Sequence, residues 1–204
     1  MDYLSADDYI NYGIPATTPL SLISNASVLL DAHCRRQTLG LAQYTERVDV
    51  SGSRRVRLTY LPMAAATGAA SAIVSARGRY TGESRRPELL LGRELTVFQL
   101  PGSWVSIDVS ELDWYGPTGE ILLTVNPLAL PFDQLEITYT AGMETISEAV
   151  KQACAMVVRN ALATPALNVR ATAVDRMHME YFADTLLDSN VRQLLAPYVA
   201  QRVG

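Results

Sequence analysis

The densest group of acidic residues in the 204-residue chain consists of Asp108, Glu111 and Asp113. Carboxylates placed this close together can work as a general acid and base, and a pair of them can cleave a glycosidic bond. A solvated turn between two strands accounts for the same residues more simply. A hydrolase that uses them is therefore the last-ranked hypothesis, and it predicts an activity that Asp108→Asn abolishes.

Residues that hold metal ions or cofactors are few and widely spaced. His33 and His178 have no further ligand three or four positions away, and Cys34 and Cys154 form no short-spaced pair. A structural metal site needs a cluster of such groups. Lys151, the only lysine, follows no glycine-rich loop, and the chain contains no G-x-S-x-G motif. The sequence thus predicts no catalytic residue, no metal and no cofactor, and a protein that is not an enzyme.

All but one of the 17 basic residues are arginine. Arginine binds carboxylates and phosphates through two hydrogen bonds and suits interfaces, although codon usage in a GC-rich genome explains the bias equally well. Four of these residues fall on a predicted polar loop that also holds Tyr80. The loop fits three interpretations: contact with a phosphate backbone, pairing with an acidic neighbour such as another copy of this chain, or exposure to solvent. Its basic residues are Arg77, Arg79, Arg85 and Arg86.

The overall charge excludes several classes of protein. The formal net charge is −4, which argues against a protein held to nucleic acid by its overall charge. No run of about 18 apolar residues is present, so we expect no membrane span. The first ten residues carry three aspartates and no basic residue, which does not fit a signal peptide. We expect a protein made in the cytoplasm, a reducing compartment, with Cys34 and Cys154 as buried free thiols; a disulfide is the alternative that the sequence leaves open.

The first 45 residues are predicted to be helical. Ser5 is a candidate N-cap for a short helix that Gly13 ends, and Pro19 to Ser21 begins a longer one. Its inner face is predicted to hold Leu22, Ile23, Ala26, Leu29, Leu30 and His33. Its outer face is predicted to hold Ser24, Asn25, Asp31 and Arg35.

Residues 44–140 have the pattern of short strands separated by turns. Apolar and polar residues alternate repeatedly, and Pro or Gly interrupts the runs, as in a sandwich or barrel. The pattern changes at Ala141-Gly142, after which Thr145 and Glu148 match a capping box. We expect a nearly uncharged helix over 145–163, either central in its own domain or partly covered by a neighbouring subunit.

The last 40 residues are predicted to form an arm and a final helix. Residues 168–173 and 177–181 each alternate, which predicts a β-hairpin or an extended arm. Ser189 is expected to cap the last helix, and Pro197 to kink or end it. The predicted fold is α+β: a small helical bundle from the two ends (1–43 and 141–204), with an inserted sandwich-like all-β module (44–140) and a C-terminal arm.

Three segments give the chain a family resemblance. They are SLISNASVLLDAHCRR, LEITYTAGMETISEAVKQACAMVV and DSNVRQLLAPYV. In order and spacing they resemble the head–tail connector (adaptor) proteins of long-tailed phages, prophages and gene transfer agents, in the longer branch with a β insertion. The likeness in order and spacing covers most of the chain, but residues 62–120 resemble the family only in their general character. Ser147 stands where that family usually has proline.

The resemblance implies a structural virion protein at the head–tail junction. In that family twelve copies form a ring beneath the portal protein, the next neck protein binds the other side, and double-stranded DNA passes through with only non-specific contact. A C-terminal segment docks on the portal, and here it corresponds to Tyr198, Val199 and Arg202. The basic loop would then lie at a subunit interface or in the channel.

A second hypothesis is a β-sandwich binding module that recognises a sugar or a protein surface. It predicts an exposed aromatic groove with Trp104, Trp114 and Tyr115 on one face. Core packing is the simpler explanation for those three aromatic residues.

Overall fold

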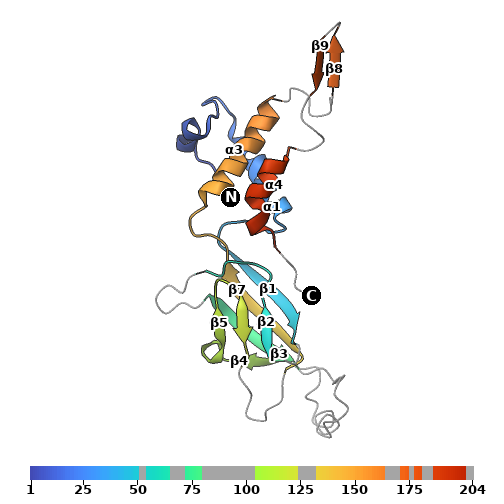
Figure 1. Ribbon diagram of the computed structural model, residues 1–204. Helices are drawn as coiled ribbons and strands as arrows, with labels where there is room; N and C mark the ends of the chain where they lie inside the picture. Colours follow the sequence, from blue (N-terminus) through green and yellow to red (C-terminus); the bar gives the residue numbers. More distant parts are fainter. Residues whose placement is uncertain are drawn as a thin grey trace, which may run out of the picture. The chain divides into compact units, whose positions relative to one another are not determined.

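The computed structural model describes residues 1–50, 54–64, 72–79, 104–123, 132–163, 171–174, 177–180 and 186–200. The chain forms two compact units. Both chain ends build a helical unit, Met1–Gly40 with Met143–Ala200, and Leu41–Gly142 builds a β unit (Figure 1). The predicted α+β class is confirmed, because helices from both ends pack together and the antiparallel strands are inserted between them.

The helical unit contains three α-helices and short 3-10 turns in its described part. The helix α3 contacts both α1 and α4, and in Figure 1 these three are drawn in orange, blue and red. The α-helices are α1 (Leu20–His33), α3 (Glu148–Ala163) and α4 (Ser189–Leu195). The 3-10 turns are η1 (Ala6–Asp8), η2 (Ile10–Tyr12) and η4 (Ala196–Tyr198).

The helix α3 is the central helix of its own unit. Six of its apolar side chains are buried within a single chain, so no neighbouring subunit is needed to cover them. It begins at Glu148 rather than at 145, because Ser147 is positioned to cap it: the Ser147 hydroxyl lies 3.4 Å from the Val150 N–H. The buried residues are Val150, Ala153, Cys154, Ala155, Val157 and Val158.

The predicted faces of α1 are wrong at two positions. Asp31 is buried with 8% of its surface exposed, whereas Leu29 is 37% exposed. The N-terminal segment explains the buried carboxylate, because the Tyr3 hydroxyl and the Leu39 backbone N–H both donate hydrogen bonds to it. Leu20 and Val28 are also exposed, so the apolar surface left on α1 is larger than the pattern predicted.

The β unit consists of two antiparallel sheets around one hydrophobic core. A four-stranded sheet has the order β1-β7-β3-β4, and a three-stranded sheet has the order β2-β6-β5. The first comprises β1 (Ala42–Asp49), β7 (Gln134–Ala141), β3 (Ile73–Arg79) and β4 (Trp104–Ile107). The second comprises β2 (Arg55–Arg57), β6 (Glu120–Leu122) and β5 (Asp113–Tyr115).

A 3-10 turn, η3 (Val109–Glu111), connects the two sheets between β4 and β5. Asp108 caps it, because its carboxylate accepts hydrogen bonds from the Ser110 N–H at 2.9 Å and the Ser110 hydroxyl at 2.8 Å. These two hydrogen bonds lower the pKa of Asp108. Asp108 therefore fixes a turn, as the simpler interpretation of the acidic residues proposed, whereas the short strand β5 was not predicted.

The C-terminal part contains the predicted hairpin. Strands β8 (Ala171–Val174) and β9 (Met177–Glu180) pair in antiparallel register, with Val174 opposite Met177. The N-cap of α4 is Asp188, whose carboxylate accepts from the Val191 N–H at 2.7 Å, and not Ser189 as predicted. Among the described helices, none combines the length and apolar character that crossing a bilayer requires.

Candidate functional site

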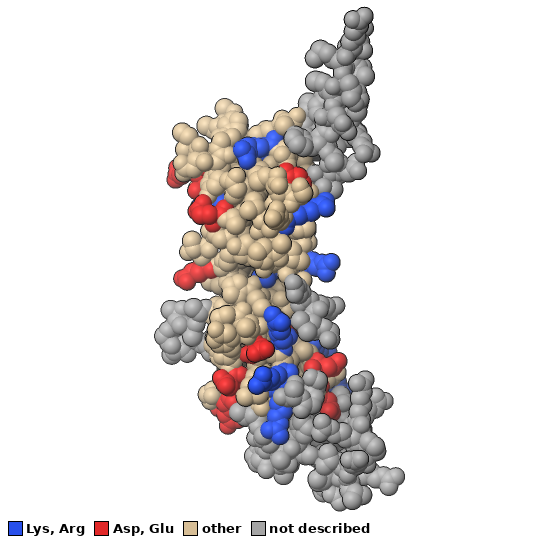
Figure 2. All heavy atoms as spheres, in the orientation of Figure 1, with Lys and Arg blue, Asp and Glu red and all other residues tan. Residues whose placement is uncertain are grey.

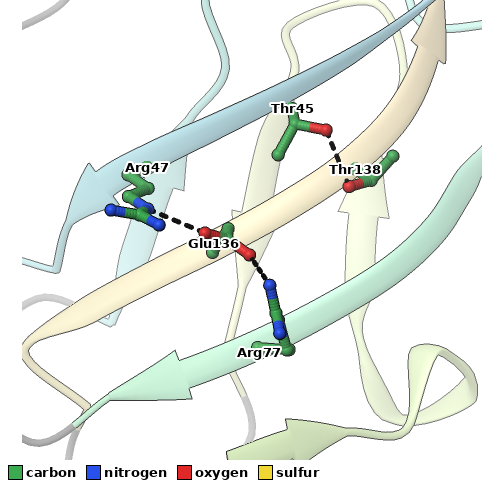
Figure 3. A network of polar contacts seen from close by, with 5 residues as sticks. All are labelled: Thr45, Arg47, Arg77, Glu136 and Thr138. Carbon is green, nitrogen blue, oxygen red and sulfur yellow. Dashed lines mark hydrogen bonds and ion pairs between the residues drawn. The ribbon is translucent and has the colours of Figure 1, made fainter. Parts of the chain in front are cut away.

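The outer face of the four-stranded sheet carries a group of charged side chains from three adjacent strands. Glu136 on the inner strand β7 lies opposite Arg47 on β1 and Arg77 on β3 in the strand register. Successive residues of a strand point to opposite faces, so the strand order brings these three side chains together on one face. Figure 3 shows Glu136 between the two arginines, with the hydrogen-bonded pair Thr45 and Thr138 beside them.

Each oxygen of the Glu136 carboxylate accepts a hydrogen bond from one arginine. Arg47 Nε donates to Oε2 at 2.7 Å, and Arg77 Nη2 donates to Oε1. The Glu136 side chain is only 9% exposed, whereas those of Arg47 and Arg77 are 69% and 53% exposed. The hydrogen bond from Arg47 lowers the pKa of Glu136 most, and the hydrogen bond from Arg77 lowers it further. The carboxylate therefore stays ionised at neutral pH and holds two solvent-facing guanidinium groups in place.

Trp104 brings a third arginine into the group. Arg79 lies opposite Trp104 in the β3–β4 register, and its guanidinium carbon is 5.8 Å from the centre of the indole ring. The guanidinium carbon of Arg47 is 5.4 Å from the same ring. Both distances suit cation–π attraction. We call these residues the arginine face: Arg47, Arg77, Arg79 and Trp104 around Glu136.

The basic residues singled out from the sequence are only partly brought together. Arg77 and Arg79 lie on the strand β3 and not on a loop, because the strand runs as far as Arg79. Arg85 and Arg86 lie outside the described residues. Sequence reasoning missed Arg47 and Glu136. Glu136 is 89 positions from Arg47 and 59 positions from Arg77, and no local sequence pattern indicates the strand register that brings them together.

The three aromatic residues of the binding-module hypothesis do not share one face. Trp104 lies on the four-stranded sheet, whereas Trp114 and Tyr115 are consecutive residues of β5 in the other sheet. Trp114 packs against the core of the β unit and Tyr115 is 60% exposed, as the alternation of a strand requires. The described structure therefore contains no aromatic groove built from these three residues.

The C-terminal segment is attached to the helical unit. The hydroxyl groups of Tyr198 and Ser147 are hydrogen-bonded at 2.9 Å, and the Ala200 N–H donates to the Cys34 carbonyl at 3.0 Å. Tyr198 and Val199 are half-buried against the helical core. Of the residues that the resemblance assigns to portal docking, Arg202 lies outside the described part.

We expect Glu136→Gln to destabilise the β unit by about 1 kcal/mol at pH 7, a small effect because both arginines are exposed to solvent. The pKa of Glu136 is lowered in the folded chain, so its contribution is present above the unfolded pKa of about 4.3 and is lost as the pH falls through the folded pKa. Urea unfolding at pH 7 and pH 3 measures the difference, with the exposed Glu120→Gln as control. A penalty that persists unchanged at pH 3 contradicts this account.

The described residues contain no group of three or more His, Cys, Asp or Glu side chains able to hold a metal ion. Comparison with known proteins adds no assignment. Neither a protein-family model nor a curated protein matches the chain.

Proposed function

We propose that the protein is a structural connector of the phage neck. Twelve copies would form a ring beneath the portal at the head–tail junction of the virion, let double-stranded DNA pass with non-specific contact only, and receive the next neck protein. One observation carries the proposal: the three segments that resemble connector proteins fold as α1, as β7 with α3, and as α4 with η4, and their helices pack together. The resemblance therefore covers all three described α-helices of the helical unit, together with the strand β7 that precedes α3.

A ring subunit must present surface to its neighbours, and α1 offers it. Leu20, Val28 and Leu29 are exposed on this helix. No charged residue occurs from Gly13 to Leu30, so this surface can be covered by another protein without burying a charge. The sequence left open whether α3 is central in its own domain or partly covered by a neighbouring subunit. Six of its apolar residues are buried within the chain and Leu162 is 43% exposed. We place the proposed contact on α1.

The C-terminal attachment supports the assignment of the docking segment. The bonds of Tyr198 to Ser147 and of Ala200 to Cys34 fix the chain on both sides of Val199. A segment whose start is already fixed loses less conformational entropy when it binds a partner. The helical unit thus gives the docking segment a defined starting point.

We expect Arg202→Glu and Val199→Ala each to weaken binding to the portal protein of the same phage or prophage about tenfold, or about 1.4 kcal/mol. Arg57→Glu makes the same charge change on an exposed residue of β2 and should leave binding unaltered. Biolayer interferometry measures the affinities, and electron microscopy of the portal complex gives the number of copies. The proposal fails if the unmodified chain does not bind the portal, or if it binds without forming a ring.

A further inference from the structure

The guanidinium groups of the arginine face are held in position but have unused donors. Each guanidinium has five N–H donors, and the contact with Glu136 uses one from Arg47 and one from Arg77. Figure 3 shows the Glu136 carboxylate between these two arginines. The indole ring of Trp104 lies within cation–π distance of Arg47 and Arg79. Because side chains that are already positioned lose less conformational entropy on binding, the face is prepared for further acceptor oxygens.

Carboxylates interrupt the positive charge of this face. Asp49 follows Arg47 by two positions on β1, so both residues lie on the same side of the sheet. Asp108 lies two residues beyond Ser106, which is opposite Arg77 in the β3–β4 register. In Figure 2, basic and acidic atoms likewise lie close together on the β unit in this view. A DNA backbone is a continuous row of negative charge that binds through many basic contacts, and a face of mixed charge does not match it.

The composition of the face instead matches an interface with another protein. Arginine and tryptophan are enriched at the centres of protein interfaces, where they account for much of the binding energy. Side chains that stand together on a sheet form a broad surface, whereas small ligands occupy concave pockets. Arg77 and Arg79 are two positions apart on β3, so they lie on the same side of the sheet about 7 Å apart. Alternate residues of an extended partner segment have this same spacing.

We propose that the arginine face is a docking surface for a partner protein, whose extended segment presents carboxylate side chains at alternate positions to Arg77 and Arg79. The charges are complementary at these two positions. A carboxylate carries one negative charge and a phosphate monoester nearly two, so the flanking Asp49 and Asp108 repel a carboxylate less. This docking surface is independent of the connector function, because it does not require that the chain forms a ring.

Titration of the full-length chain with defined peptides tests the docking surface. The probe is an acetylated Gly-Glu-Gly-Glu-Gly amide, and the same peptide with Gln in place of Glu is the control. In a Trp114→Phe chain, Trp104 is the only tryptophan, so its fluorescence reports binding at the face. At low salt we expect the glutamate peptide to bind about tenfold more tightly than the glutamine peptide. Equal affinities for the two peptides would overturn the inference.

Variants of the face test whether positioned arginines are responsible. Arg77→Gln and Arg79→Gln should each weaken the affinity for the glutamate peptide about fivefold. Arg57→Gln, on an exposed residue of the other sheet, should leave it unaltered. Glu136→Gln makes the face more positive but releases its arginines, so we expect weaker binding. Tighter binding by this variant would show that net charge alone attracts the peptide, and the inference would then be wrong. Circular dichroism confirms that each variant is folded.

Two further measurements identify a different occupant. A duplex oligonucleotide that binds more tightly than the glutamate peptide, and loses affinity with Arg77→Gln and Arg79→Gln, identifies the DNA backbone as the ligand and overturns the inference. Dimers of the unmodified chain that Arg79→Gln dissociates, measured by analytical ultracentrifugation, identify a second copy and overturn it as well. Portal binding without peptide binding would refute this docking surface and leave the connector function standing. Peptide binding without portal binding would refute the connector function alone.

Discussion

Asp31→Ala is expected to lower the free energy of unfolding by about 2–3 kcal/mol. The substitution removes a buried carboxylate that accepts hydrogen bonds from the Tyr3 hydroxyl and the Leu39 N–H. Hydrogen bonds to charged groups contribute about 1.5–3 kcal/mol, and deleting the acceptor leaves buried donors with fewer partners. Urea unfolding followed by circular dichroism measures the loss. The exposed Asp7→Ala should change the free energy by less than about 0.5 kcal/mol.

The contribution of Asp31 to the free energy of unfolding is expected to depend on pH. Burial raises the pKa of Asp31, with the Tyr3 and Leu39 hydrogen bonds opposing that shift. A raised folded pKa means that the contribution of this group is fully present below the unfolded pKa of about 3.9 and is lost as the pH rises through the folded pKa. The neutral Asp31→Asn chain should therefore gain stability relative to the unmodified chain between pH 4 and pH 7. A relative loss over that interval would show that the folded state favours the ionised carboxylate.

Gly78→Ala should destabilise the β unit by about 1–3 kcal/mol because it overfills the core. A Cβ atom at Gly78 would lie 2.4–2.6 Å from three ring atoms of Phe132, closer than packed atoms tolerate. Glycine is needed here for the space beside the ring. At Gly13, by contrast, no atom lies within 4 Å of the added Cβ, and the φ of +67° alone makes Gly13→Ala unfavourable, by about 1 kcal/mol.

A double-mutant cycle separates the steric cause from a general weakness of the strand. Once Phe132→Ala has removed the ring, adding Gly78→Ala should have little further effect, with a coupling energy of about 1–2 kcal/mol. Unfolding free energies of the four chains give this coupling energy. Independent, additive effects would show that the contact with Phe132 is not what excludes a side chain from position 78.

Local patterns were sufficient to predict the types of many secondary-structure elements. The alternation over 135–140 and the apolar spacing after Ser147 depend on neighbouring residues only, and the structure has β7 and α3 there. Helix ends were less predictable. Thr145 and Ser147 are both hydroxyl residues near the start of α3, and their identity alone does not show which one caps it.

The errors concern contacts between residues distant in sequence. Asp31 looked like an outer-face residue because the pattern of α1 contains no information on Tyr3, 28 positions earlier, which buries it. The apolar spacing of α3 likewise did not decide between a central helix and one covered by a neighbouring subunit, because α1 and α4, which pack against it, are distant in sequence. The arginine face required the registers of β1 and β3 with β7, which alternation alone leaves undetermined.

The chain leaves and re-enters the helical unit at a single place. Gly40 and Met143 form an isolated β-bridge, and the Met143 N–H donates to the Leu39 carbonyl at 2.9 Å. The two ends of the segment Leu41–Gly142 therefore start from hydrogen-bonded neighbours. Insertions whose ends lie this close together impose little constraint on their host. Evolution can therefore lengthen, replace or delete the segment Leu41–Gly142 as a whole, while α1 and α3 keep the same packing against each other.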